Sequence, residues 1–134
     1  MKIVVIDGQG GKMGKSIVEK IKEANICCEL LVVGTNSIAT SAMLKAGADN
    51  GATGENAVVV ASKSADVIIG PIGIIVADAL FGEITPTMAI SVGQSRAKKF
   101  LLPVNLCNNI IVGTNNVSIN HLITEVIDNL IKLN

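Results

Sequence analysis

The sequence IVVIDGQGGKMGKS, residues 3 to 16, carries the strongest structural signal in this chain. Its four leading apolar residues predict a short buried strand. A turn with glycines at 8, 10, 11 and 14 follows, and a helical pattern begins at Lys12. A strand, glycine turn and helix in this order direct backbone N–H groups and the positive end of a helix toward a phosphate. The stretch therefore predicts a phosphate-bearing ligand and leaves the reaction open.

The remainder of the chain alternates apolar runs with segments of helical period, the pattern of a parallel sheet covered on both faces. Thr85 and Pro86 are a typical helix cap and first-turn proline, and Gly47 is a typical residue just after a helix. We expect strands at 2–6, 27–33, 67–69, 100–104 and 110–112. We expect helices at 12–24, from 37 to Gly47, and at 56–62, 74–81, 85–98 and 117–133, with a glycine-rich loop at 49–54.

Length and composition fit one globular domain. The chain has 134 residues, of which 49% are hydrophobic, mostly Ile, Val, Leu and Ala. This is enough for one core and leaves little room for a second. We expect residues 1–134 to form a single Rossmann-like nucleotide-binding domain of the α/β class. Its architecture is three-layered and doubly wound, a mainly parallel sheet of about five strands with helices on both faces.

Several classes of function are disfavoured by composition. Eleven basic residues balance eleven acidic ones, and the chain lacks Trp and Tyr, so a nucleic-acid partner is not expected. Cys27, Cys28 and Cys107 fit no common zinc spacing, and His121 is the single histidine, so no metal site is predicted. We interpret the cysteines as core or near-core thiols and His121 as a surface residue. No signal peptide or membrane span is evident, so we expect a cytoplasmic protein without a membrane partner.

The glycine turn departs from the general dinucleotide pattern G-x-G-x-x-G. Gly8 and Gly10 occupy the first two positions, but Met13 stands at the third and Gly14 follows one residue late. The order G-x-x-G-[RK]-M-G fits better, and in it the turn resembles that of the amino-terminal domain of dihydrodipicolinate reductase. The resemblance covers about fifteen residues. It implies a Rossmann-type site for NAD or NADP with the pyrophosphate near the glycines.

Open α/β sheets bind ligands at the carboxyl ends of their strands. Small or hydrogen-bonding residues follow the first three predicted strands, so we expect the cofactor site to comprise Asp7, Gly8, Gln9, Gly10, Gly11, Lys12, Met13, Gly14, Gly34, Thr35, Asn36, Gly70 and Pro71. No acid follows the second strand to bind the ribose, although Asn36 can hydrogen-bond a ribose hydroxyl. The paired-histidine motif and substrate domain of the reductase have no counterpart, and we identify no catalytic residue.

Over its full length the chain resembles a small bacterial family catalogued as a domain of unknown function, which implies no activity. Our leading hypothesis is a stand-alone module that binds a nucleotide-type small molecule. The alternative is a small NAD(P)-dependent oxidoreductase whose active site is completed by oligomerisation. Apolar residues such as Phe81, Ile84 and Phe100 favour a homodimer or higher homo-oligomer. A further alternative is an atypical P-loop ending in Gly14-Lys15-Ser16, although Gln9 stands where that motif requires glycine.

Overall fold

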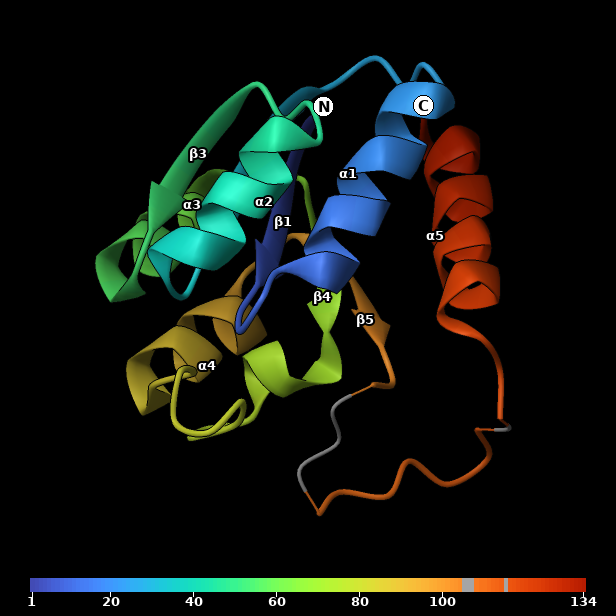
Figure 1. Ribbon diagram of the computed structural model, residues 1–134. Coiled ribbons are helices and arrows are strands. Elements are labelled where there is room, and N and C mark those ends of the chain that lie inside the picture. The colour runs from blue at the N-terminus through green and yellow to red at the C-terminus, as the bar shows by residue number, and fades with distance from the viewer. Residues whose placement is uncertain (105–107, 115) are drawn as a thin grey trace.

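The computed structural model describes residues 1–104, 108–114 and 116–134. The chain alternates strands and helices almost throughout (Figure 1). The elements are, in order, β1 (Lys2–Asp7), α1 (Lys12–Glu23), β2 (Glu29–Gly34), α2 (Ser37–Lys45), β3 (Asn50–Thr53), α3 (Glu55–Ser64), β4 (Val67–Pro71), the 3₁₀ helix η1 (Ile72–Ile75), α4 (Pro86–Gln94), β5 (Lys98–Leu102) and α5 (Ile119–Leu133).

The five strands form one parallel sheet in the order β3-β2-β1-β4-β5. The chain builds outward from β1 to β3, then returns to the other side of β1 and continues through β4 and β5. The order therefore reverses between β1 and β4, where open α/β sheets form their ligand crevice. This arrangement confirms the expected Rossmann-like, doubly wound architecture with helices on both faces.

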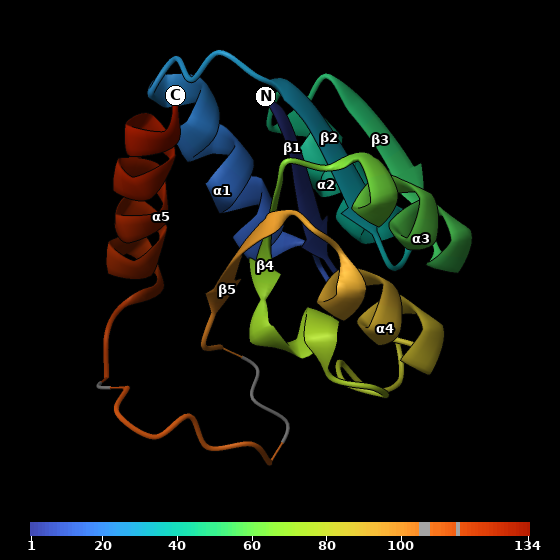
Figure 2. The same ribbon diagram turned by 180° about the vertical axis from the view of Figure 1, so that it is seen from behind.

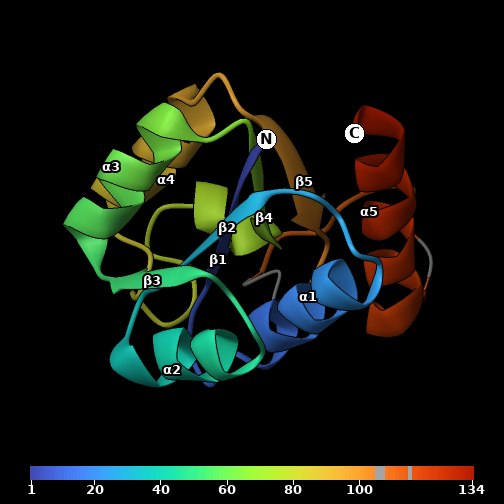
Figure 3. The same cartoon turned by 90° about the horizontal axis from the view of Figure 1, so that it is seen from above.

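Helices cover both faces of the sheet (Figure 3), and each face is buried by an apolar cluster. On one face α1, α2 and α5 cover alternate residues of the central strands, among them Ile3 and Val5 of β1. On the other face α3, α4 and the segment after β4 cover Val4 and Ile6. Because β1 is central, residues 3–6 are all fully buried, which explains why its sequence is a continuous apolar run.

Helix α5 returns to the face that carries α1 after a long connection from β5 (Figures 1 and 2). Ser118 caps its first turn by accepting a hydrogen bond from the His121 N–H at 3.2 Å. Ile123 and Leu130 on its apolar face are fully buried. The described part of the connection, residues 103–104, 108–114 and 116–118, is mostly exposed. The first turn of α5 lies near the glycine turn, since Ile119 and Asn120 line the same pocket as Gly10.

Several local predictions are confirmed. The first helix spans nearly the expected range, and Thr85 caps α4 with Pro86 at its first position. Asn36 caps α2 by accepting the Ala39 N–H at 2.9 Å. Gly47 lies just beyond α2 with φ of +115°, a conformation that suits glycine.

Two predictions about strands are wrong. Residues 49–54, expected as a loop, contain β3, which pairs with β2 at the sheet edge. Its sequence, Asn-Gly-Ala-Thr, has weak strand propensity, so pairing with β2 rather than composition determines its structure. Conversely, residues 110–112 form no strand, and Ile110 and Val112 are 86% and 93% exposed. An apolar β-branched run resembles a strand, but only long-range pairing makes one.

Other boundaries move. The helix expected at 74–81 is only the 3₁₀ turn η1 followed by irregular backbone with several left-handed residues. Helix α4 ends at Gln94 rather than 98, and β5 begins two residues before the expected strand. Ile84 is buried and Phe100 half-buried, whereas Phe81 is 98% exposed. His121 is exposed as expected, Cys27 is exposed rather than near the core, Cys28 is half-buried, and Cys107 lies outside the described residues.

Candidate functional site

Asp7, the last residue of β1, holds the glycine turn together. Its carboxylate is buried at 5% exposure, and its two oxygens accept different backbone N–H groups: Oδ1 from Gly8 at 2.8 Å and Oδ2 from Gly14 at 2.7 Å. One side chain thus connects the beginning of the turn to the first helical turn of α1. We interpret Asp7 as the residue that fixes the shape of this phosphate-type loop.

The environment of Asp7 makes ionisation of its carboxyl less favourable than in water. Burial raises the pKa of this carboxyl above its ordinary value of 3.8, and the nearby negative charge of Glu83 acts in the same direction. The hydrogen bonds from Gly14 and Gly8 oppose the rise without cancelling it. Asp7 is therefore held by hydrogen bonds within the turn in a place where water solvates its carboxyl poorly.

Three of the four glycines in the turn are required by close packing. A Cβ at Gly11, where φ is +71°, would lie 2.7 Å from the Cα of Ala39 in α2. A Cβ at Gly8 would lie 2.5 Å from Thr35 Oγ1, and one at Gly14 would collide with Met43. Gly10 differs, because a Cβ there would meet no atom within 4 Å. The open side of the turn is therefore at Gly10, where a ligand can approach the backbone closely.

A pocket of about 550 Å³ opens at the glycine turn. Its wall includes the predicted residues from Asp7 to Met13, together with Ser16 of α1. The opposite side is formed by Val104, just after β5, and by Ile119 and Asn120 in the first turn of α5. Two helix N-termini thus contribute to one pocket at the carboxyl edge of the sheet. Their partial positive charges favour an anionic group.

Backbone donors remain available on the pocket side of the turn. Gly11 N–H donates to Gly8 O at 2.9 Å, and the N–H groups of Gly8 and Gly14 donate to Asp7. No acceptor for the N–H groups of Gly10, Lys12 and Met13 occurs among the residues that the structure describes. Lys12 and Met13 are the first two residues of α1, whose N–H groups have no partner within the helix. All three residues that carry these donors line the pocket.

The other side of the turn faces the end of β2, where the structure reveals a residue that sequence reasoning missed. Glu83 Oε1 accepts hydrogen bonds from the Thr35 hydroxyl at 2.7 Å, the Asn36 side-chain amide at 2.6 Å and the Gln9 N–H at 3.0 Å. Asn36 also donates to the Gln9 carbonyl at 2.9 Å. The predicted residues Thr35 and Asn36 therefore join the glycine turn through a carboxylate from the segment after β4.

The charged form of Glu83 is favoured at this position. Partial burial opposes ionisation, but the hydrogen bonds from Thr35, Asn36 and Gln9 together hold the pKa of this carboxyl below its ordinary value of 4.5. One sequence signal could have directed attention to it. Asp78 and Glu83 are the only acids between residues 67 and 97, the stretch that follows the strand beside β1.

Three further predicted residues, Gly34, Gly70 and Pro71, lie at the carboxyl ends of β2 and β4. Gly34 ends β2, where a Cβ would collide with Thr40 of α2. Gly70 and Pro71 end β4 and are buried, and a Cβ on Gly70 would collide with the Ile6 carbonyl. None of the three lines the pocket at the glycine turn. They shape the sheet edge rather than offering groups to a ligand there.

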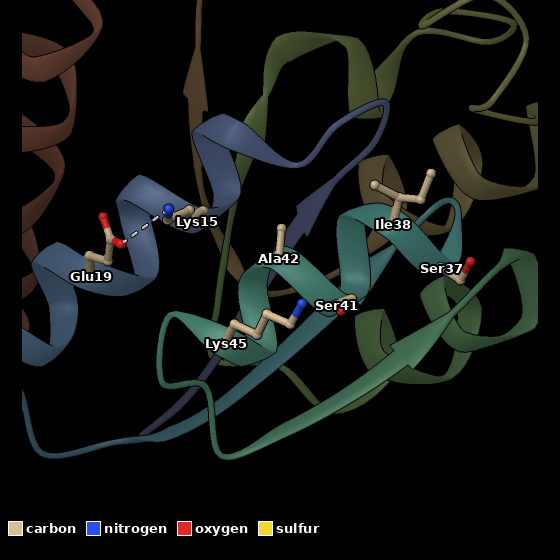
Figure 4. A pocket seen from close by; sticks show the side chains of 7 residues that line it. All are labelled: Lys15, Glu19, Ser37, Ile38, Ser41, Ala42 and Lys45. Carbon is tan, nitrogen blue, oxygen red and sulfur yellow. Dashed lines mark ion pairs between the residues drawn. The ribbon is translucent and has the colours of Figure 1, made fainter.

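A larger groove of about 780 Å³ lies on the outside of the molecule between α1 and α2 (Figure 4). Lys15 and Glu19 line it from α1 and pair at 3.8 Å, while Ile38 on α2 is 70% exposed. Lys15, the lysine of the alternative P-loop reading, thus faces this groove and does not line the pocket at Gly10. We regard the smaller pocket as the candidate site, because the free backbone donors are there.

Comparison with known proteins places the chain in a family. Residues 2–134 match the model of a domain of unknown function (DUF3842). The chain belongs to this family. No curated protein and no solved structure matches it. The similarity of the glycine turn to dihydrodipicolinate reductase therefore remains an observation on the turn sequence alone. In the described ranges, no helix is long and apolar enough to cross a membrane, and no three metal-ligating side chains are grouped around a common point.

Proposed function

We propose that this protein binds a nucleotide, most favourably the dinucleotide NAD or NADP, with the phosphates at the pocket side of the glycine turn. The observation that carries the proposal is that Gly10, Lys12 and Met13 all line one pocket and that their N–H groups have no acceptor among the described residues. Phosphate oxygens are acceptors that such a helix start binds well. The strand order, which reverses beside β1, supports the same position.

The residues fit a dinucleotide in two further respects. Gly10 leaves open space where a pyrophosphate must approach the backbone, and the first turn of α5 adds a second positive helix end. Phosphoryl transfer is less well supported, because Lys15 faces the groove between α1 and α2. A bound nicotinamide would supply hydride chemistry, but no described residue is placed here in a catalytic role. A binding module is therefore the function that the site supports best.

Thermal denaturation with a ligand panel tests the proposal. The panel comprises NADH, NADPH, NAD, ATP with magnesium, and flavin nucleotides. We expect a dinucleotide at a hundredfold excess over its Kd to add about 2.7 kcal/mol, which raises the Tm by several degrees. Gly10→Glu should abolish the shift, since its carboxylate occupies open space at the donors and repels phosphate, while the Tm without ligand stays close to that of the original protein.

The control variant is Gly93→Glu, which adds the same side chain at an exposed glycine of α4 with no atom within 4 Å of its Cβ. It should keep the ligand shift. Gly11→Asp is unsuitable, because its Cβ would collide with the backbone of Ala39 and any loss of binding would follow from misfolding. A shift that survives Gly10→Glu, or no shift with any ligand, would overturn the proposal.

A further inference from the structure

The carboxylate of Glu83 lies beside the residues that follow β2. In such domains an acid at the end of the second strand hydrogen-bonds the 2′-hydroxyl of the adenosine ribose. Here β2 ends in Gly34, followed by Thr35, Asn36 and Ser37, without an acid. Glu83 fills this position from another part of the chain, because it is bound directly to Thr35 and Asn36.

We propose that Glu83 is the ribose-recognising and specificity-determining acid of this site, so that the protein binds the 2′-hydroxyl form of the dinucleotide, NAD or NADH, and rejects the 2′-phosphorylated form. This inference rests on the proposed function. The inference adds to that function an orientation of the ligand, with the adenosine end on the Glu83 side of the turn and the phosphates on the Gly10 side.

Hydrogen bonding leaves one oxygen of Glu83 available to a ligand. All three protein groups that donate hydrogen bonds to Glu83 donate to Oε1, and no described residue donates to Oε2. The side chain is only partly buried, so Oε2 can accept from a ribose hydroxyl. The donors on Oε1 also keep the group ionised, which makes it a strong acceptor and a repellent for a second negative group.

The backbone around Glu83 is built to hold it in place. Leu80 and Ile84 are each 1% exposed and anchor the segment in the core. The Asp78 N–H donates to the Ile84 carbonyl at 2.7 Å, and the Glu83 N–H donates to the Leu80 carbonyl at 3.1 Å. Asp78, Leu80 and Phe81 adopt positive φ, a strained conformation that persists only where surrounding contacts impose it. These contacts hold the backbone at Glu83 close to the carboxyl end of β2.

The charges on the two sides of the glycine turn determine which part of the dinucleotide binds on each side. Glu83 binds the Gln9 N–H, so that donor is satisfied by a carboxylate and a phosphate there would meet like charge. On the pocket side the described donors of Gly10, Lys12 and Met13 are free. A neutral ribose diol can donate a hydrogen bond to Glu83 while the pyrophosphate accepts hydrogen bonds near Gly10. A 2′-phosphate beside Glu83 would instead place two negative groups together.

Calorimetric titration of the full chain with NADH and NADPH tests the inference. We expect NADH to bind at least about tenfold more tightly than NADPH, because like charges brought together at a recognition site are strongly unfavourable. Glu83→Gln keeps an acceptor oxygen for the three donors and removes the charge. It should bring the NADPH affinity to within about threefold of the NADH affinity, chiefly by improving NADPH binding.

Asp78→Asn is the matched control. It removes one negative charge from the same segment at an exposed residue whose positive φ asparagine tolerates. This variant should retain the preference for NADH. Equal binding of the two dinucleotides to the original protein, or a preference unchanged by Glu83→Gln, would overturn the inference and leave the proposed function standing. Absence of binding by both would overturn the inference together with the dinucleotide part of the proposed function.

Discussion

Asp7 is the single side chain on which the shape of the glycine turn most depends. In Asp7→Asn an amide nitrogen replaces one carboxylate oxygen, so one of the N–H groups of Gly8 and Gly14 loses its acceptor in a buried place. We expect unfolding to become easier by about 2 kcal/mol, the usual effect of an unsatisfied buried donor. Urea denaturation measures this. Asp128→Asn on the exposed face of α5 is the control and should change the unfolding free energy little.

The loss from Asp7→Asn should depend on pH in a defined direction. Burial raises the pKa of Asp7 above 3.8, so the folded state holds this proton more tightly than the unfolded state. Stability contributed by Asp7 is therefore greatest below the unfolded pKa and declines as pH rises through the raised folded value. The gap in unfolding free energy between the original protein and Asp7→Asn should narrow over that window. A gap that widens with pH, or no gap at all, contradicts this role.

At the level of single residues, the sequence was enough to predict the glycine turn but not the contact between this turn and Glu83. Gly8, Gly10, Gly11 and Gly14 follow one another on a local strand-to-helix signal, and the structure places them in a single turn. Glu83 lies 74 residues from Gln9, and no local pattern marks such a contact. Long-range pairing of side chains is set by the sheet order, which spacing alone does not reveal.

Among the secondary elements, α5 forms the wall of the pocket opposite the glycine turn, through Ile119 and Asn120. Its first turn forms one wall, and its position depends on the apolar face that packs with α1. Leu130, which is fully buried, should destabilise the fold by about 2–5 kcal/mol when changed to alanine. Urea denaturation beside Ile131→Ala, at a 54% exposed neighbour, measures the effect. Equal stability of the two variants would show that α5 is not docked as described.

Element prediction succeeded where burial and local pattern agree. Residues 3–6 of β1 are all apolar and buried on both faces of the sheet, and α5 carries a clear apolar stripe. It failed where tertiary pairing overrides composition. Asn50–Thr53 becomes an edge strand because β2 offers hydrogen-bonding partners. Residues 110–112 have strand-like composition but pair with no strand in the part of the chain that the structure describes. The segment after β4 was misjudged as helix because its apolar residues anchor an irregular, strained loop.

For the molecule as a whole, the parallel sheet and its strand order establish the scaffold, and the nucleotide remains a proposal. Self-association also remains a prediction, motivated here by exposed Phe81, Ile110 and Val112. The two sides of the glycine turn offer different groups to a ligand because they face different parts of the fold. Free backbone donors face the pocket, and an ionised carboxylate faces the end of β2. That division is what makes the orientation of a bound dinucleotide predictable.

Titration of ¹⁵N-labelled protein with NADH, followed by the chemical shifts of the backbone amides, tests the phosphate site most directly. The amide resonances of Gly10, Lys12 and Met13 should move together and saturate at one Kd, because their N–H groups gain acceptors. The resonances of Gly93 on α4 and Gly51 on β3 should stay in place. If NADH leaves the first three resonances unmoved at saturating concentration, or moves only those elsewhere, the glycine turn is not a phosphate site.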